Sequence, residues 1–326
     1  MKRALALCLA LVSPGFAASD FSQGAIGTSG SEFLLFDVGA RGIGMGGAFT
    51  AVSQDATSLY WNPAGLARVP KFSAAFTYNR LVADMSYQAA AAAQRISDGS
   101  VLAAGLRHRD AGDITRTDLA GNDRGSFRPR DYILDLGWGQ GIFDLSDNDM
   151  DVLMGVAARW IHSDYGETAD ALAGDIGVIA RFYTGLLPYD VGFSAQNMGR
   201  GQKFDKARDH LPFRARFGGA IYPLNGMTVS GDIVTPINNQ AHFAVGGEYG
   251  LAFDRNIEGF ARLGFNSLTL ESLGTASAIS AGVGLRVADF AFDYAFSPAG
   301  PLGAGLHRLS IGYNLPAKTS QRYKER

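Results

Sequence analysis

The sequence DVLMGVAARWI, residues 151–161, alternates between two kinds of side chain with a period of two. One set of alternating positions is apolar or small and consists of Val152, Met154, Val156, Ala158 and Trp160. The other set includes the charged residues Asp151 and Arg159. Because successive side chains of a strand point to opposite faces, the pattern predicts a β-strand with one apolar face.

The same alternation recurs between residues 69 and 315, and it predicts an all-β, membrane-spanning antiparallel barrel of fourteen strands. The strands are about nine to twelve residues long, close to the length that a tilted strand needs to cross a bilayer. An even number of strands returns the chain to the side where it entered. The predicted strands start near Lys71, Asp84, Ser100, Arg130, Asp151, Gly174, Tyr189, Leu211, Gly226, Gln240, Asn256, Ser277, Asp289 and Leu306.

Connection lengths between these strands alternate. Long polar connections are expected at residues 110–129, 163–173, 197–210, 266–276 and 297–305. Tight turns are expected at residues 97–99, 185–188 and 223–225, and the connection at 139–150 is an exception that is longer than the alternation allows. Long loops on one rim and short turns on the other are typical of an outer-membrane β-barrel.

Charged residues within the predicted strands assign the two faces of the wall. An arginine that faces lipid near the middle of the membrane costs about 2 to 4 kcal/mol, so these charges are expected to face the lumen. They are Arg159, Arg181, Arg214, Arg216, Glu248, Arg262, Arg286 and Asp293. A barrel of fourteen strands is too wide for its wall side chains to fill, so the lumen is either a channel or plugged.

Residues 1–17 have the pattern of a secretory signal peptide, with Lys2 and Arg3 before an apolar run at 4–12 and the small residues Gly15 and Ala17 before the expected cleavage site. The alternative is a buried N-terminal strand or helix. The single cysteine, Cys8, lies in this run, so we expect the mature chain to lack disulfides and thiol chemistry. An exported barrel is expected in a bacterial outer membrane, surrounded by its lipid.

The composition excludes several classes of protein. With 29 basic and 31 acidic residues, the chain has no field that would attract nucleic acid. A charged fraction of 18%, 42 glycines and 21 phenylalanines favour strands and turns over helices. No segment after the signal peptide has eighteen consecutive apolar residues, which excludes a helical membrane protein.

Residues 18–68 lack strand alternation and are rich in glycine, and we expect this N-terminal segment to plug the barrel. The runs DVGARGIGMGGA (37–48), DATS (55–58) and WNPAGL (61–66) resemble the N-terminal signature of the PorV/PorQ family of outer-membrane proteins. QNMG at 196–199 and DYAF at 293–296 add weaker support, and the polar tail at 316–326 departs from the terminal aromatic residue of many such barrels. The plug or gate residues are Asp37, Gly39, Arg41, Gly42, Gly44, Gly46, Gly47, Asp55, Asn62, Pro63 and Ala64.

The resemblance implies two alternative functions. PorV-like members are implied to assist type IX protein secretion, with secreted proteins or components of the secretion machinery as partners. The family also resembles the wider FadL-like group, which is implied to carry hydrophobic small molecules past an N-terminal plug. A barrel with a purely structural role is a third possibility.

Each of the two functions predicts a different feature. Transport predicts an apolar pocket in the lumen and an opening through the wall. Secretion predicts an extended loop that binds protein, and the mixed-charge loop at 110–129, with Arg116, Arg124 and Arg128, is the candidate, although such loops are usually just solvated.

Other motifs do not indicate chemistry. The glycines at 42, 44 and 47 satisfy GxGxxG, but no βαβ unit follows, so close packing of the backbone against the wall is the better interpretation. Asp147, Asp149 and Asp151 have the opening spacing of a calcium loop, yet Val152 and Ala158 stand where its glycine and glutamate belong.

The five histidines are scattered, and the sequence has no nucleophile elbow. We therefore predict no metal site, no cofactor and no catalytic centre, so that the chain is not an enzyme. Asn62 and Pro63 form either a simple turn at the end of the plug or a gate.

Overall fold

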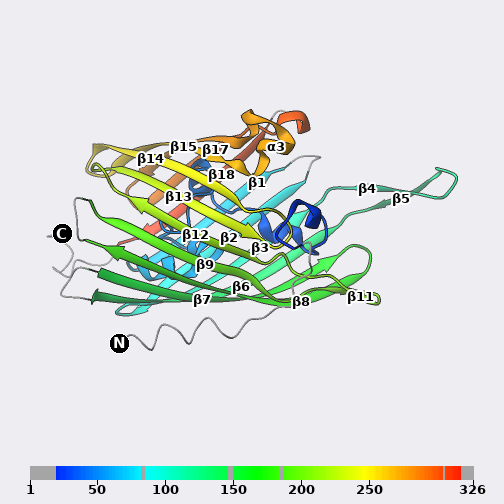
Figure 1. Ribbon diagram of the computed structural model, residues 1–326, viewed down its shortest axis with the longest axis horizontal. Helices are drawn as coiled ribbons and strands as arrows, with labels where there is room; N and C mark the ends of the chain where they lie inside the picture. The colour runs from blue at the N-terminus through cyan, green and yellow to red at the C-terminus, as the bar shows by residue number, and fades with distance from the viewer. Residues whose placement is uncertain (1–19, 82–84, 146–149, 184–186, 304, 317–326) are drawn as a thin grey trace.

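The computed structural model describes residues 20–81, 85–145, 150–183, 187–303 and 305–316. Fourteen antiparallel strands in this part of the chain close into one barrel (Figure 1). The first strand pairs with the last over nine residues, from Phe72 with Leu315 to Arg80 with His307, so the sheet has no open edge. The predicted fold class and strand number are confirmed.

The barrel strands follow one another around the wall in the order of the chain. They are β1 (Phe72–Arg80), β2 (Ser86–Ser97), β3 (Ser100–Asp110), β6 (Arg130–Leu145), β7 (Met150–Asp164), β8 (Thr168–Phe182), β9 (Tyr189–Arg200), β12 (Arg214–Ile221), β13 (Met227–Pro236), β14 (His242–Asp254), β15 (Ile257–Asn266), β16 (Ile279–Val287), β17 (Phe290–Ser297) and β18 (Leu306–Leu315). Most start within three residues of the predicted positions.

Alternation along each strand gives the wall an apolar outer face. On β7, Met154, Val156 and Trp160 are exposed on the outside, whereas Arg159 is 4% exposed on the inside. This arrangement, repeated around the barrel, suits a wall surrounded by lipid.

Connections at the two ends of the barrel differ in length (Figure 1). One end, here called the long-loop rim, carries the hairpin of β4 (Ile114–Thr117) and β5 (Asp123–Phe127) and the shorter hairpin of β10 (Lys203–Phe204) and β11 (Ala207–Arg208). It also carries η4 (Ser267–Thr269), α3 (Leu270–Leu273), η5 (Thr275–Ala278) and η6 (Gly300–Leu302). The opposite end, the short-turn rim, has tight turns such as that at Gly226. No helix in the described residues is long and apolar enough to cross a membrane.

Two of the predicted connections are wrong. The long loop expected at 163–173 is mostly strand, because β7 continues to Asp164 and β8 begins at Thr168 rather than near Gly174. The connection expected at 139–150 is shorter than predicted, since β6 continues to Leu145 and β7 starts at Met150. At 164–173 small and polar residues continue the pairing of β7 with β8 beyond the apolar stretch of the wall, and at the end of β6 the pairing continues through Ile142. The predicted start near Asp84, the signal peptide and the tail at 317–326 lie outside the described residues.

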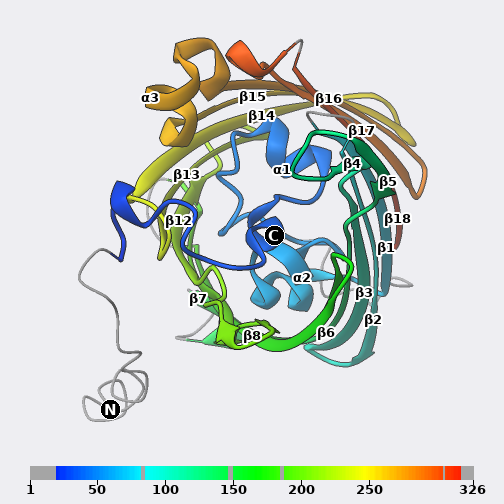
Figure 2. The same cartoon turned by 90° about the vertical axis from the view of Figure 1, so that its right-hand side faces the viewer.

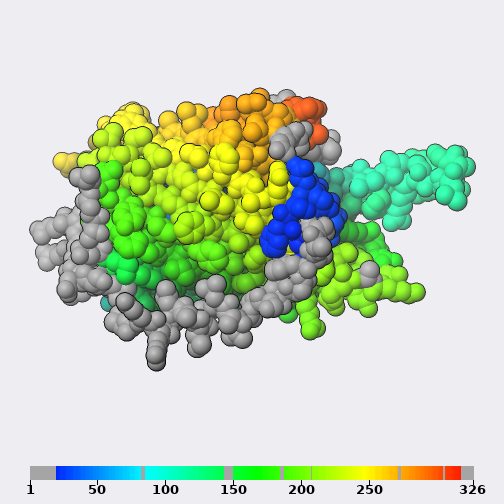
Figure 3. Space-filling view, in the orientation of Figure 1, coloured from blue at the N-terminus to red at the C-terminus, as the bar shows by residue number. Residues whose placement is uncertain are grey.

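The N-terminal segment lies inside the ring of strands (Figure 2). Its short helices are η1 (Gln23–Ala25), η2 (Glu32–Leu35), α1 (Ala40–Gly44), α2 (Ser58–Trp61) and η3 (Pro63–Arg68). The segment starts on the long-loop rim, where the Phe21 N–H donates to the Ile237 carbonyl, and its first residues are visible at the outer surface (Figure 3, dark blue). It ends at the short-turn rim, where the Arg95 guanidinium donates to the carbonyls of Ala67 and Val69.

Candidate functional site

The interior of the barrel is the candidate site, and its centre is the packing of the N-terminal segment. Leu59, Trp61 and Leu66 are at most 1% exposed and belong to one apolar cluster that also includes inward residues of β2 and β3. The Trp61 indole N–H donates to the Val38 carbonyl at 2.7 Å, which joins α2 to the residues just before α1. Burial of these three large side chains fixes the segment inside the wall.

The glycine-rich stretch brings the backbone of the segment against the wall. A Cβ at Gly42 would lie 2.7 Å from the Trp61 ring, and one at Gly46 would lie 2.7 Å from the backbone of Phe265 in β15. Gly46 also has a φ of 69°, which disfavours any residue with a side chain. Gly44 lies beside Gly282 of β16, and Gly47 accepts a hydrogen bond from Arg216 at its carbonyl.

Asn62, Pro63 and Ala64 form the contact between the segment and the wall of β7 to β9. The Asn62 side chain accepts from the Ala64 N–H at 3.1 Å and donates to the Thr50 carbonyl at 2.9 Å. It is fully buried. A Cβ at Gly155 of β7 would collide with the Pro63 backbone, so this position requires glycine.

Among the described residues, four ion pairs join the segment to the wall, one of them between Asp37 and Arg216 of β12 at 3.7 Å. Arg41 of α1 pairs with Glu248 of β14 at 2.7 Å, and Arg68 of η3 pairs with Asp190 of β9 at 2.7 Å. Asp37, near the long-loop rim, pairs with Arg214 of β12 at 3.3 Å. Asp55 makes a local contact, accepting from the Thr57 N–H at 2.8 Å, and Gly39 precedes α1 as its cap.

The predicted lumen charges lie at inward positions, most of them in ion pairs. Arg159 contacts Asp135 at 3.0 Å and Asp175 at 2.5 Å, and all three side chains are at most 3% exposed. Arg262 joins Glu248 and Asp293, each at 2.6 Å.

Other predicted lumen charges lie closer to the rims of the barrel. Arg216 pairs with Asp232 at 3.1 Å. Arg181 pairs with Asp190 at 2.7 Å near the short-turn rim, with a side chain 30% exposed. Arg286 pairs with Glu258 near the same rim, where both side chains remain more than 40% exposed.

Sequence reasoning missed most of the carboxylates that complete these pairs. Asp135, Asp175, Asp190 and Asp232 are buried on the inner face, as is Arg107, which pairs with Asp135 at 2.7 Å. Each interrupts an apolar strand at an inward position, and that placement is the signal that could have identified them.

A small cavity and an open groove accompany the packed segment. The cavity, of about 40 Å³, lies between the segment and the wall, beside Arg41, Asp55 and Asp293, and has room for a few water molecules. The groove, of about 560 Å³, lies on the outer wall and is lined by residues such as Ala90 and Phe76. Among the residues that the structure describes, no group of three or more histidine, cysteine or acidic side chains could hold a metal ion.

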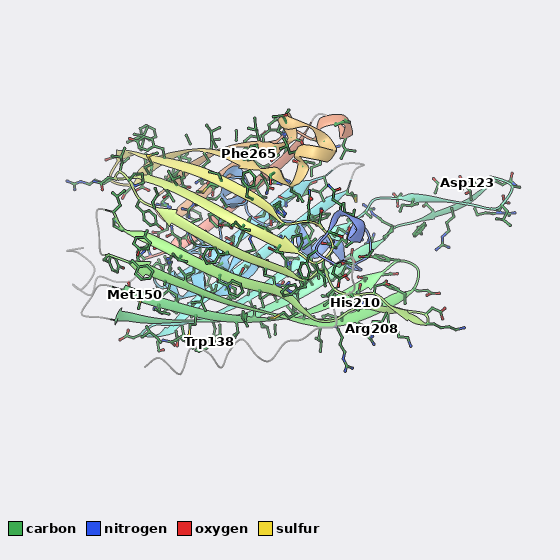
Figure 4. All side chains as sticks on the ribbon, in the orientation of Figure 1. Asp123, Trp138, Met150, Arg208, His210 and Phe265 are labelled. Atoms are coloured by element: carbon green, nitrogen blue, oxygen red, sulfur yellow. The ribbon has the colours of Figure 1, made fainter. Side chains whose placement is uncertain are left out.

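The β4–β5 hairpin projects beyond the barrel (Figures 1 and 4), and Asp123 lies on it, clear of the wall. Asp118 orders its tip by accepting from the N–H groups of Ala120 and Asn122, both at 2.9 Å. Donation from Asn122 and Arg124 lowers the pKa of the Asp118 carboxyl. Leu119 at the tip is fully exposed.

The fold is a closed β-barrel of fourteen strands whose lumen holds the N-terminal segment. The chain belongs to the PorV family, because the family described as "Type IX secretion system protein PorV" matches residues 19–223. No curated protein sequence matches the chain.

Three solved structures illustrate the similarity of fold. A TodX deltaS2S3 mutant monoaromatic hydrocarbon channel has a TM-score of 0.56 at 11% identity, with 86% of this chain and 100% of that chain covered. The Ralstonia pickettii toluene transporter TbuX has a TM-score of 0.56 at 12% identity, with 86% of this chain and 98% of that chain covered. A Pseudomonas aeruginosa FadL homologue has a TM-score of 0.53 at 11% identity, with 85% of this chain and 98% of that chain covered. These identities show the fold alone, and the absence of enzymatic activity stays a prediction.

Proposed function

We propose that this chain is an outer-membrane component of a type IX secretion machinery, which assists secreted proteins at the cell surface while its own lumen stays closed. The observation that carries the proposal is the β4–β5 hairpin, which projects beyond the long-loop rim. The N-terminal segment, fixed to the wall by the pairs Arg41–Glu248 and Arg68–Asp190, occupies the lumen. In this proposal, the segment is a plug and the long-loop rim faces the outside of the cell. Membership of the PorV family supports it.

The β4–β5 hairpin is the proposed contact for protein. Its charges are compensated internally, since Arg124 pairs with Asp118 at 2.9 Å and Arg128 with Asp110 at 2.8 Å. The hairpin therefore exerts little net field, and the exposed Leu119 is its most prominent apolar group. An ordered loop with an exposed leucine at its tip could anchor the chain in an apolar pocket of another protein.

The alternative, transport of hydrophobic small molecules in the FadL manner, has weaker support. Several similar barrels are described as hydrocarbon channels or toluene transporters, but the likeness is at 11 to 12% identity. The cavity beside the plug, about 40 Å³, is far below the several hundred Å³ of an ordinary ligand pocket.

Crosslinking in the native outer membrane tests the proposal. The barrel is purified after crosslinking, bound proteins are identified by mass spectrometry, and bound lipids are extracted from the same sample. We expect secreted proteins or secretion-machinery components in the eluate. A stoichiometric fatty or aromatic ligand with no protein partner would instead support the transporter.

A further inference from the structure

The groove of about 560 Å³ on the outer wall follows one strand, β2. Ala90 and Ala92 lie on the outer face of this strand and are exposed. In the register of the sheet, Ala90 lies between Phe76 of β1 and Leu106 of β3, whose side chains are 47% and 52% exposed. Small residues on one strand between large residues on its neighbours form a furrow that runs along the strand, here called the outer furrow.

The outer furrow is narrow and apolar. Neighbouring strands lie about 4.8 Å apart, so β1 and β3 are separated by about 10 Å across β2, and their side chains leave space for a single chain. The lining also includes Ala74, Ala104 and Leu134, and none of the described residues that line it is charged. Small residues allow close packing, which drives association where no water is present.

Polar side chains continue the same surface toward the long-loop rim. Gln88 is the next outward residue of β2, and it lies between Tyr78 of β1 and His108 of β3. The Gln88 amide donates to the Ser86 hydroxyl at 3.0 Å, and the His108 ring stacks on Tyr132 with centroids 4.6 Å apart. Aromatic side chains of this kind mark the level where the hydrocarbon of a membrane meets the lipid headgroups.

Guanidinium groups lie one step further toward the rim. The register of the sheet places Arg80 of β1 opposite Ser86, and Arg130 of β6 opposite Asp110 of β3. The Asp110 carboxylate pairs with Arg128 at 2.8 Å. Arginine therefore occurs on both sides of the polar end of the outer furrow.

We propose that the outer furrow binds one acyl chain of a membrane lipid that carries a phosphate group. The chain lies along β2 over Ala90 and Ala92, and the phosphate lies at the level of Arg80 and Arg130. Guanidinium groups bind phosphate through charge-assisted, often bidentate hydrogen bonds. A lipid matches both the apolar furrow and its cationic end, whereas the broad wall of another barrel would not enter a furrow one strand wide. The site goes beyond the proposed function and does not rest on it.

Native mass spectrometry of the purified full-length barrel, titrated with three probes, tests the proposal. The probes are dipalmitoyl phosphatidylglycerol, dipalmitoylglycerol, which has the same chains and no phosphate, and dihexanoyl phosphatidylglycerol, which has the same headgroup and short chains. We expect one molecule of dipalmitoyl phosphatidylglycerol to bind roughly tenfold more tightly than either of the others.

Variants locate the site. Ala90→Leu fills the furrow and should weaken binding of dipalmitoyl phosphatidylglycerol roughly tenfold. Ala158→Leu makes the same change at an exposed alanine on the outer face of β7 and should bind normally. Arg80→Gln should weaken binding of dipalmitoyl phosphatidylglycerol and leave that of dipalmitoylglycerol unchanged. Heat-modifiable migration on a gel reports whether each barrel is folded.

Photo-crosslinking in cells identifies what covers the furrow. With p-benzoylphenylalanine in place of Leu106, we expect an adduct that adds the mass of a lipid. An adduct with another protein, or with a second copy of this chain, would overturn the proposal.

Two binding results would also overturn it. One is equal binding of dipalmitoyl phosphatidylglycerol and dipalmitoylglycerol, and the other is a folded Ala90→Leu barrel that binds the phospholipid as tightly as the Ala158→Leu barrel. Neither result depends on capture of secretion partners, so the lipid site and the secretion role fail separately.

Discussion

Arg41 of the N-terminal segment and Glu248 of β14 form a two-pronged ion pair, with Nη2 to Oε1 at 2.7 Å and Nε to Oε2 at 2.9 Å. The two side chains are 18% and 5% exposed. Arg262 contacts the same carboxylate at 2.6 Å. Glu248 therefore joins the N-terminal segment and β15 inside the barrel.

Glu248→Gln should destabilise the barrel by about 3 to 5 kcal/mol, because it removes the carboxylate that pairs with Arg41 and one of the two carboxylates that pair with the buried Arg262. The measurement is loss of the folded gel form with increasing urea. Arg286→Gln is the matched control, since the Arg286–Glu258 pair is more than 40% exposed and should contribute less than about 1 kcal/mol. Equal losses in the two variants would contradict a structural role for Glu248.

Gly155→Ala should displace the plug, because the new Cβ meets the Pro63 backbone, which cannot move aside as a flexible side chain can. We expect increased permeability of reconstituted liposomes to small sugars. Gly247→Ala, at an outward position on β14 with open space around it, is the control and should leave permeability unchanged. Intact sealing by a folded Gly155→Ala barrel would argue against the plug.

The Asn62→Ala variant distinguishes the two interpretations of Asn62, a structural turn and a gate. The substitution leaves the Thr50 carbonyl and the Ala64 N–H without the partners at 2.9 and 3.1 Å, and should lower stability by about 1 to 3 kcal/mol. If Asn62 is a structural turn, liposome permeability stays at the level of the unmodified chain in conditions where the barrel is folded. An open barrel of undiminished stability would indicate a gate.

Leu119→Ser should reduce capture of protein partners severalfold, because the hairpin loses its exposed anchor while its backbone order is kept by Asp118. The readout is the yield of crosslinked proteins. Leu224→Ser changes a leucine that is 65% exposed at the short-turn rim and should leave the yield unchanged. Equal effects of the two substitutions would remove the hairpin from the proposed contact.

Order at the hairpin tip should depend on pH. Hydrogen bonds from Asn122, from nearby backbone N–H groups and from Arg124 hold the pKa of Asp118 below its ordinary value of 3.8. A lowered pKa means that the order is complete above that ordinary value and is lost as the pH falls through the lowered pKa. A spin label at Ala120 should gain mobility below pH 3.8, and a gain near neutral pH would contradict this account.

The fold was predictable because every second residue of a strand in a membrane wall faces lipid and is apolar, as at 152–160. The extension of β8 from Gly174 back to Thr168 was not predictable. Beyond the apolar band of the wall, outward and inward residues of a strand no longer differ in polarity. Alternation with small residues at Ala169 and Ala171 is its remaining sequence signal.

The predicted site residues are mostly interior, but their partners could not be assigned from sequence. Arg41 and Glu248 are 207 positions apart, and Arg68 and Asp190 are 122 apart. Such pairs depend on how the plug is threaded through the barrel, which neither strand periodicity nor glycine content specifies.

Comparing the secreted proteins of cells with and without this chain tests the central claim most directly. The account predicts that a defined set of proteins disappears from the medium and cell surface when the chain is removed, and returns when it is restored. Unchanged secretion together with reduced uptake of hydrophobic small molecules would contradict the account and identify a transporter.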